Sequence, residues 1–301
     1  MQSLTKLAVI ILNYNSYELS IHAARNIQAL DGSIKIIIVD NCSKDNSAEM
    51  LNEEFNNDSD VSVVLNKENL GYANGNNVGI RYALTLDVDT ILIMNPDITV
   101  DNREILEKLY TLLNNHPQIG AATVSTIFNG KINKPNECAW MFMNKLQMLF
   151  SGTLLKKLVH NCYYPNIVAN SEGYALVDIV QGCFFMIKLE NMKKINYFDD
   201  NTFLYCEEAI LARRLQSIGL HNAVLPSLFI HHNHKEKNKK LQKYDNKRFD
   251  MNCYYNSRKY YIRNYSGESK IYIKLTSLYL SVDYYVKLCC LKVRKAIGRI
   301  K

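Results

Sequence analysis

Residues 7–15 read LAVIILNYN, an unbroken apolar run that is followed directly by polar residues. The same pattern returns in three further segments, at 34–41 (IKIIIVDN), 61–66 (VSVVLN) and 90–97 (TILIMNPD). Short runs rich in β-branched residues are typical of strands that are buried on both faces of a parallel sheet. We therefore predict four parallel strands in the first third of the chain.

Helical stretches at 17–30, 46–55, 74–84 and 102–114 alternate with these strands. Asp45 or Asn46, and Asp101, are expected to cap two of the helices at their N-termini. Alternation of strands and helices predicts an α/β fold of the Rossmann-like kind, in which helices flank a mostly parallel sheet and the crossovers are right-handed.

The pattern resumes after a less regular middle at residues 126–177. Residues 178–187 predict a strand interrupted by Gly182, where a ligand or another backbone can come close. A helix over 207–218, closed by Gly219, and a last strand over 223–232 follow. Residues 275–293 have helical apolar spacing, which predicts a C-terminal helical extension. Packing of this helix on the main domain and docking on a membrane surface both fit its sequence.

Polar side chains stand at the ends of the predicted strands. Asn13 and Asn15 follow the first strand, Asp40 the second, and Asn95 and Asp97 the fourth. In an open parallel sheet the carboxyl ends of the strands form the ligand crevice. Asn and Asp are also common in ordinary turns, but several polar strand ends in succession favour a shared site.

Charge is distributed unevenly along the chain. The net charge is +7, and lysine and arginine concentrate after residue 234 and again over residues 292–301. A basic end suits phosphates or an anionic membrane surface, while a solvated charge run explains the first segment equally well. No run reaches the roughly 20 apolar residues that span a bilayer, and no secretory signal opens the chain. The eight cysteines lack paired CxxC spacing, so we expect free thiols in a reducing cytoplasm.

Two motifs suit the binding of an anionic ligand. Residues 69–79 (NLGYANGNNVG) precede or open a predicted helix, and glycines there allow a diphosphate or sugar to approach the backbone. An ordinary loop before a helix is the alternative. Asn95-Pro96-Asp97 places a carboxylate at a strand end, where Mg²⁺ or Mn²⁺ could bind it together with diphosphate oxygens. A simple turn initiated by proline is the alternative.

Two further motifs suit proton transfer and ligand contact. Glu207 and Glu208 open a predicted helix and point in different directions, so we expect one to be a general base and the other to orient structure or bind acceptor. The alternative is that both only favour the helix N-terminus. His231, His232 and His234 end the last strand, where alternation lets only one of the first two face the crevice.

Taken in order, these segments resemble glycosyltransferase family 2, especially its rhamnosyltransferase-like branch. The resemblance covers roughly residues 7–235. It implies a GT-A fold and inverting transfer from a nucleotide-diphosphate sugar, either a dTDP-rhamnose-like donor or a UDP-sugar. The implied acceptor is a cell-surface glycan or a lipid-linked molecule. The segments that carry the resemblance are residues 9–15, 38–45 and 71–79, Asn95-Pro96-Asp97, Gln181-Gly182 and residues 203–214.

The resemblance also implies roles for single residues. Glu208 takes the position of the catalytic base, with Glu207 as its supporting neighbour. Gly182 and Glu207 are expected on the acceptor side, and Asp97 and His232 are expected to hold Mg²⁺ or Mn²⁺. The implied donor-binding residues are Asn13, Asn15, Asp40 (as the base-recognising carboxylate), Asn69, Gly71, Asn74, Asn77, Asn95 and Asp97.

The chain departs from the family pattern at three positions. Asn95 replaces the first Asp of the metal-binding motif, Glu208 replaces the usual Asp of the base, and Ile210 stands where a further Asp is common. The last two departures favour a non-catalytic binding protein on the same fold as an alternative. Another nucleotide-binding α/β enzyme would carry a glycine- and lysine-rich loop after the first strand, and residues 13–16 (NYNS) offer none.

The expected organisation is a GT-A domain at 1–240 and a basic, amphipathic helical extension at 241–301. The expected partners are the nucleotide-sugar donor, the glycan or lipid-linked acceptor and an anionic membrane surface, with no nucleic acid among them. This predicts a cytoplasmic enzyme of polysaccharide biosynthesis, or one peripheral on the inner face of the membrane.

Overall fold

The computed structural model describes residues 3–128, 130–132, 138–233 and 243–297. The chain divides into two compact units. The first comprises Met1–Met141, Tyr163–Asp200 and Glu207–His234, and the second comprises Phe142–Cys162, Asn201–Cys206 and Lys235–Lys301. The second unit therefore contains the C-terminal helices and also two segments from within the first 240 residues.

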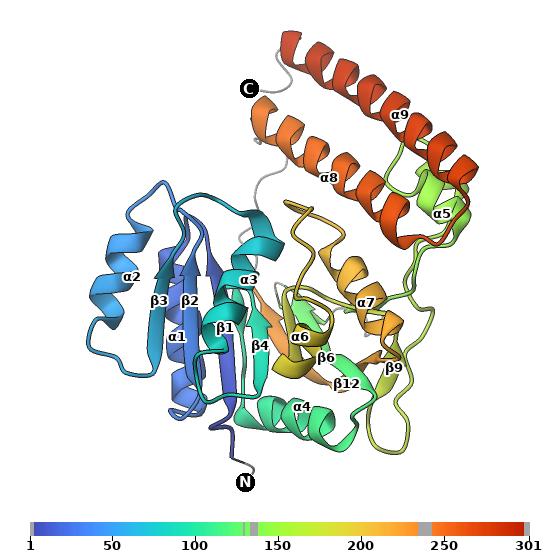
Figure 1. Ribbon diagram of the computed structural model, residues 1–301. Coiled ribbons are helices and arrows are strands. Elements are labelled where there is room, and N and C mark those ends of the chain that lie inside the picture. The colour runs from blue at the N-terminus through green and yellow to red at the C-terminus, as the bar shows by residue number, and fades with distance from the viewer. Residues whose placement is uncertain (1–2, 129, 133–137, 234–242, 298–301) are drawn as a thin grey trace. The chain divides into compact units, whose positions relative to one another are not determined.

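A mixed sheet forms the centre of the first unit (Figure 1), with strand order β3-β2-β1-β4-β11-β6-β12-β5. The first four strands are parallel, as predicted. β11 runs antiparallel between β4 and β6, and β12 runs parallel to β6. The bounds are β1 (Leu7–Asn13), β2 (Lys35–Asp40), β3 (Val61–Leu65), β4 (Thr90–Met94), β5 (Ile98–Thr99), β6 (Ile119–Phe128), β7 (Lys131–Ile132), β8 (Ala139–Trp140), β9 (Ala175–Val177), β10 (Ile179–Val180), β11 (Phe184–Lys188) and β12 (His221–His232).

Helices cover both faces of this sheet (Figure 1). α1, α2 and α4 pack in one hydrophobic cluster with alternate strand residues such as Val9 and Ile38. α3, α6 and α7 pack in another with the residues between them, such as Ile10 and Val39. The expected sheet flanked by helices is thereby confirmed. The bounds are α1 (Tyr17–Leu30), α2 (Ser47–Phe55), α3 (Gly71–Ala83), α4 (Arg103–Asn115), α6 (Leu189–Lys194) and α7 (Glu207–Ser217).

Helix ends follow the predicted sequence signals with one correction. Asn46 occupies the N-cap position of α2, and Gly219 adopts a φ of 79° just after α7. The N-cap of α4 is Asn102 and not Asp101. The Asn102 side chain accepts a hydrogen bond from the Ile105 amide at 3.3 Å, while the Asp101 carboxylate lies 2.9 Å from the His231 ring.

Two stretches, residues 119–128 and 178–187, differ from the prediction. β6 was not expected, because hydroxyl residues interrupt its apolar run. Their hydroxyls are satisfied inside the sheet, where Thr123 donates to the Phe184 carbonyl at 2.6 Å and Ser125 donates to the Pro226 carbonyl at 2.9 Å. Residues 178–187 form two strands and not one. β10 pairs with β8 in a small sheet of its own, whereas β11 joins the main sheet.

Residues 71–79 of the glycine-rich segment lie within helix α3, which begins three residues before the helix predicted over 74–84. Its glycines recur every four residues, which places Gly75 and Gly79 on one face of the helix. A Cβ added to Gly75 would lie 2.6 Å from Leu12 Cδ1, and one added to Gly79 would lie 2.6 Å from Ile10 Cγ2. These glycines therefore let α3 lie directly against β1 and β2, which is a packing role that was not predicted from the sequence.

The second unit is helical, with α5 (Lys145–Phe150), the short 3-10 helix η2 (Lys156–Leu158), α8 (Tyr244–Tyr265) and α9 (Lys270–Ala296). Arg258 of α8 is 2% exposed and donates to the backbone oxygens of Gln147 and Met148 at 3.0 and 2.6 Å. This guanidinium therefore binds two carbonyls of α5, and the Gln147 oxygen also accepts the Ser151 backbone N–H at 2.9 Å. Among the described helices, none has a stretch that is long and apolar enough to cross a membrane. All eight cysteines are free thiols.

The close packing of α3 predicts a strong effect of Gly79→Ala. The added methyl would meet Ile10 Cγ2. Ile10 lies inside a strand, and its β-branched side chain has little freedom to rotate away. We expect the free energy of unfolding to fall by about 1–2 kcal/mol, because overpacking outweighs the gain in helix propensity of about 1 kcal/mol. Urea denaturation measures this change.

Gly32→Ala is the matched control, because a Cβ at Gly32 would meet nothing within 4 Å. It should leave stability unchanged or raise it by up to about 1 kcal/mol. Equal stability of the Gly79→Ala and Gly32→Ala variants would contradict the packing role of Gly79.

Candidate active site

The ends of β1 and β2 are joined by a buried pair of polar side chains. Asn13 and Asp40 are partners in the strand register, and the Asn13 amide donates to Asp40 Oδ1 at 2.7 Å. Asp40 also accepts the Ser43 hydroxyl at 2.5 Å and, through Oδ2, the Ser43 backbone N–H at 3.0 Å. The Asn13 carbonyl oxygen accepts the Ser20 hydroxyl at 2.8 Å. Asn13 therefore fixes the Asp40 carboxylate, which can only accept hydrogen bonds when ionised.

The backbone turns sharply beside this pair. Asn15 and Cys42 both adopt positive φ angles, of 53° and 58°. The Asn15 side chain accepts the Lys44 backbone N–H at 2.7 Å, and the Asn15 backbone N–H donates to the Ser43 hydroxyl at 2.8 Å. The two strand-end loops are thus tied to each other, as the predicted convergence at the sheet edge requires.

Asn41 organises the approach to α3, and sequence reasoning did not select it. Its amide group donates to Asn69 Oδ1 at 3.0 Å and to the Gly71 carbonyl at 3.1 Å. Its carbonyl oxygen accepts the Asn66 amide and the Leu70 backbone N–H, both at 3.0 Å. Its place directly after β2 was the available signal, because each predicted strand end offers a polar residue.

The asparagines of α3 bind the loop that follows α6. Asn77 is 1% exposed, donates to the Phe198 carbonyl at 3.0 Å and accepts the Phe198 backbone N–H at 3.0 Å. Asn74 is partly exposed and donates to the Asp200 carbonyl at 3.2 Å. Both side chains therefore hold residues 198–200, and Gly71, with a φ of 75°, begins the helix.

Asp97 lies beside His232 just past the end of β4. Asp97 Oδ1 is 3.3 Å from His232 Nε2, and the two side chains are only 11% and 16% exposed. Asn95 precedes them and donates its backbone N–H to the Cys183 carbonyl at 2.8 Å. His231 projects to the other side and contacts Asp101, so strand alternation separates the two histidines. His234 lies outside the described residues.

A carboxylate and an imidazole side by side are two of the ligands that a divalent cation such as Mn²⁺ accepts. Among the described residues no group of three or more His, Cys, Asp or Glu side chains gathers in metal-binding geometry. Asp97 and His232 therefore fit a cation whose remaining ligands come from outside the protein, such as phosphate oxygens and water.

Glu208 lies directly on Gly182. A Cβ added to Gly182 would fall 2.5 Å from Glu208 Oε1 and 3.0 Å from its Cγ, so only glycine leaves room for this side chain. Backbone hydrogen bonds at Glu208 and Gly182 hold the carboxylate. Burial nevertheless raises the pKa of Glu208 above its ordinary value, because it disfavours the charged form more than these hydrogen bonds favour it.

Two further side chains close this site. The Tyr72 hydroxyl of α3 donates to the Gly182 carbonyl at 2.5 Å. Burial, and next the charge of Glu208, raise the pKa of Tyr72 well above its usual value. Burial, and next the charges of Asp97 and Glu208, raise the pKa of the Cys183 thiol. The thiol thus lies within electrostatic reach of both carboxylates, which brings the proposed metal ligand and the proposed base to one region.

The two residues before α7 have unusual backbone geometry. Tyr205 and Cys206 adopt φ angles of 75° and 69°, which non-glycine residues rarely adopt. Glu207 follows as the first residue of α7 and is 5% exposed. Strained backbone of this kind clusters at functional sites.

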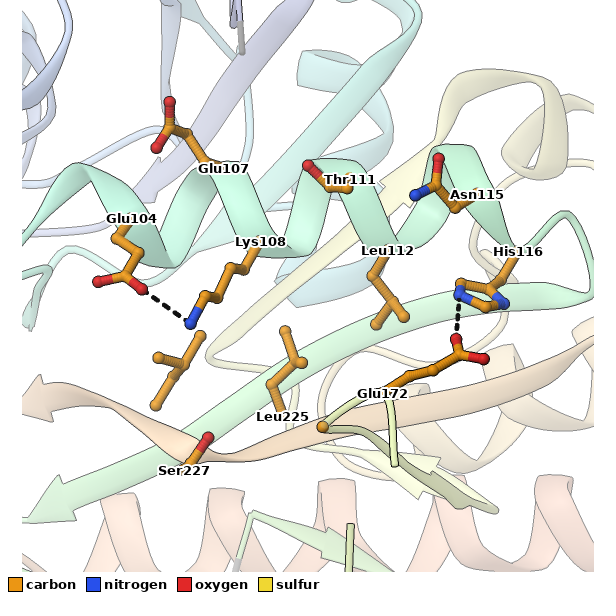
Figure 2. Close-up of a pocket in the computed structure, with 12 residues that line it drawn as sticks. Glu104, Glu107, Lys108, Thr111, Leu112, Asn115, His116, Glu172, Leu225 and Ser227 are labelled. Atoms are coloured by element: carbon orange, nitrogen blue, oxygen red, sulfur yellow. Dashed lines mark ion pairs between the residues drawn. The ribbon is translucent and has the colours of Figure 1, made fainter. Parts of the chain in front are cut away.

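A separate cavity of about 520 Å³ lies on the α4 side of the sheet (Figure 2), opposite the face that α7 covers. Two of its carboxylates already have side-chain partners. Glu104 contacts Lys108 at 2.7 Å, and Glu172 contacts His116 at 2.8 Å. This cavity contains none of the residues of the candidate site.

Comparisons with known proteins identify the family and the fold of the chain. The model of the family "Glycosyl transferase family 2" matches residues 8–194. The low-salt glycan biosynthesis hexosyltransferase Agl10 of Haloferax volcanii is 28% identical over 208 residues, which are 68% of this chain and 60% of Agl10. The chain thus spans less than two thirds of that relative's length. Rhamnosyltransferase WbbL of Escherichia coli K12 is 21% identical over 233 residues, which are 76% of this chain and 84% of WbbL.

Solved structures share the fold. The mannosyltransferase PcManGT of Pyrobaculum calidifontis, in complex with GDP-Man and Mn²⁺, superposes with a TM-score of 0.58 at 16% identity, covering 97% of this chain and 74% of its own. TarS 1–349 of S. aureus, in complex with UDP-GlcNAc, gives a TM-score of 0.52 at 13% identity, covering 90% and 70%. At these identities the similarity shows the fold alone.

The raised pKa of Glu208 predicts how stability depends on pH. The folded protein binds the Glu208 proton more tightly than the unfolded chain does. The stability that this residue contributes is therefore present below its unfolded pKa and is lost as the pH rises through its folded pKa. We expect Glu208→Gln to be more stable than the native chain at neutral pH, with a smaller difference below the ordinary carboxyl pKa.

Thermal unfolding at several pH values measures this difference, and each 1 kcal/mol corresponds to about 2–4 °C in a protein of this size. Glu190→Gln is the control, since the Glu190 side chain is 62% exposed and should show no such trend. A Glu208→Gln variant that is less stable than the native chain at neutral pH would contradict the burial of an ionised carboxylate.

Proposed function

The chain belongs to glycosyl transferase family 2 and is a glycosyltransferase of GT-A fold, and from this premise we propose its reaction. It transfers a hexosyl group, with inversion, from a nucleotide-diphosphate sugar to a hydroxyl of a cell-surface glycan or lipid-linked acceptor at an anionic membrane surface. The observation that carries this proposal is the Glu208 carboxylate seated on Gly182, with the Cys183 thiol in electrostatic reach of both Glu208 and Asp97.

Glu208 is the proposed general base. Its burial raises its pKa towards the working pH, where a base accepts a proton most effectively. Ionised Glu208 takes the proton of the acceptor hydroxyl, and the acceptor oxygen forms its bond to the anomeric carbon. The bond from that carbon to the diphosphate breaks on the opposite face, and the nucleoside diphosphate leaves with the electron pair. No covalent sugar–enzyme intermediate is needed.

Asp97 and His232 are the proposed protein ligands of a divalent metal. When bound there, Mg²⁺ or Mn²⁺ would neutralise charge that develops on the leaving diphosphate. An imidazole in the ligand pair favours Mn²⁺ over Mg²⁺, which prefers oxygen ligands. The presence of Mn²⁺ with GDP-Man in PcManGT supports this proposal.

The proposed donor side comprises the strand ends of β1 and β2 and the start of α3. Asp40 is held by Asn13 and Ser43, so its carboxylate is preorganised to accept N–H groups of a nucleobase. The name of WbbL supports a dTDP-rhamnose-like donor, and the ligand of TarS supports a UDP-sugar. Gly182 and Glu207 remain the proposed acceptor-side residues.

We predict that Glu208→Gln lowers the rate of sugar transfer by about 10²–10⁴-fold, the usual contribution of a general base. Nucleotide binding should remain largely intact, because Asp40 and its partners do not involve Glu208. Product formation from a panel of nucleotide sugars, together with calorimetric titration of the nucleotide, measures both effects. Glu208→Asp keeps a carboxylate and should retain partial activity. Full activity in Glu208→Gln would refute the assignment of the base.

We predict that a chelator abolishes transfer and that Mn²⁺ restores it. Asp97→Asn should raise the Mn²⁺ concentration that is needed by roughly tenfold or more, since it removes a charged ligand. Asp101→Asn is a matched control, because Asp101 pairs with His231 just as Asp97 pairs with His232. Mn²⁺ titration of transfer activity measures this requirement in both variants, and we expect only Asp97→Asn to raise it. Unchanged activity in chelator would refute the role of Asp97 in metal binding.

A further inference from the structure

α9 carries a stripe of apolar side chains that its own unit leaves open to solvent. These side chains are each at least 43% exposed, which is unusual for large apolar residues on one helix. They are Ile271, Leu275, Leu278, Val282, Tyr285, Val286 and Val293.

The stripe occupies a single face of the helix. Its residues recur at intervals of three or four, and exposed Cys289 fills the interval between Val286 and Val293. At about 1.5 Å per residue the stripe extends for about 33 Å. The face that holds α9 in its unit is a different one, since Thr276, Leu280 and Asp283 are at most 4% exposed.

The exposed charges of α9 are all positive. Lys274 and Lys292 are exposed and stand 18 residues apart, which is five helical turns, so they lie at the same edge of the stripe. Lys270, Arg294 and Lys295 are also exposed. The acidic residue within α9, Asp283, is buried and lies 3.3 Å from Lys287.

We propose that this stripe docks the protein on the surface of an anionic lipid bilayer, with α9 lying in the plane of the headgroups. An amphipathic helix with apolar residues on one face and lysines at its edge has the chemistry of an interfacial helix. Two copies of the chain that met through this stripe would bring only positive charges to their shared border, which disfavours a dimer. Anionic headgroups supply the opposite charge along the whole stripe.

The docking gives the proposed membrane location a physical basis in α9, and its consequence for the acceptor rests on the proposed function. A transferase held on a bilayer meets acceptors that are confined to that bilayer, so among the proposed acceptors docking favours the lipid-linked class. The donor, being soluble, reaches the site from the aqueous side.

The test is co-sedimentation of the full chain with vesicles of phosphatidylcholine and with vesicles of an equal mixture of phosphatidylcholine and phosphatidylglycerol. We expect binding to the mixed vesicles that falls with added salt, and much weaker binding to phosphatidylcholine alone. Leu278→Ser should weaken binding several-fold. Leu158→Ser is the matched control in the same unit, with 66% exposure against 63% for Leu278, and should bind like the native chain.

Replacing lysines of α9 by glutamine tests whether positive charge contributes to binding of anionic lipid. Lys274→Gln and Lys292→Gln should each weaken binding to the mixed vesicles by about fivefold. Arg248→Gln, at an exposed position of α8, should not. Failure of the native chain to bind mixed vesicles, or equal binding by the Leu278→Ser and Leu158→Ser variants, would overturn the proposal. So would a dimer in size-exclusion chromatography that Leu278→Ser dissociates. Nucleotide binding, measured in parallel, should be unchanged in every variant, so failure of docking is distinguishable from failure of the proposed reaction.

Discussion

The closeness of α3 to β1 and β2 determines where the chemical groups of the first unit can stand. Gly75 and Gly79 contact Leu12 and Ile10 with no room for a side chain. At this distance the Tyr72 hydroxyl reaches the Gly182 carbonyl, and Asn77 exchanges two hydrogen bonds with Phe198. One helix thus fixes both the segment that supports Glu208 and the loop that precedes α7. Methyl groups at Gly75 and Gly79 would hold α3 farther from the sheet, where it would no longer make the contacts with Gly182 and Phe198.

Gly182, which has no side chain, makes room for the longer Glu208 side chain. The resemblance to the family implies the shorter Asp at the position of the proposed base, where this chain has Glu208. The glutamate side chain extends over Gly182, with Cγ and Cδ at 3.0 and 3.1 Å from the point where a Cβ would stand. The extra methylene therefore has a place to lie, and the backbone at Gly182 binds the carboxylate that it delivers. Substitution of Asp by Glu at this site is compatible with a fixed and partly desolvated base.

Sequence predicted the parts of this structure that depend on local periodicity. The strands β1 to β4, the helix α1 and the end of α7 at Gly219 follow from apolar runs and terminal residues. The strand β6 was not predicted, because its hydroxyl groups find carbonyl partners only in the folded sheet. The packing role of Gly75 and Gly79 was not predicted, because their partners, Leu12 and Ile10, are distant in sequence. Tyr72 carried no signal of its own, and Asn41 carried only its place after β2, since the importance of both lies in contacts that only the fold creates.

The residues that hold the site differ in kind from those that would react. Tyr205 and Cys206 have left-handed backbone geometry, which costs about 1–3 kcal/mol at each position. The Glu208 carboxylate of α7 is buried, which also costs free energy. Such an arrangement persists only where other contacts outweigh it. Arg214 of α7 donates to buried Asp199 at 2.9 Å and to the Tyr197 carbonyl at 3.1 Å, in the loop that Asn77 also binds. The proposed reactive residues are acids and a histidine, whereas the contacts that hold the surroundings of Glu208 come from glycines, amides and an arginine.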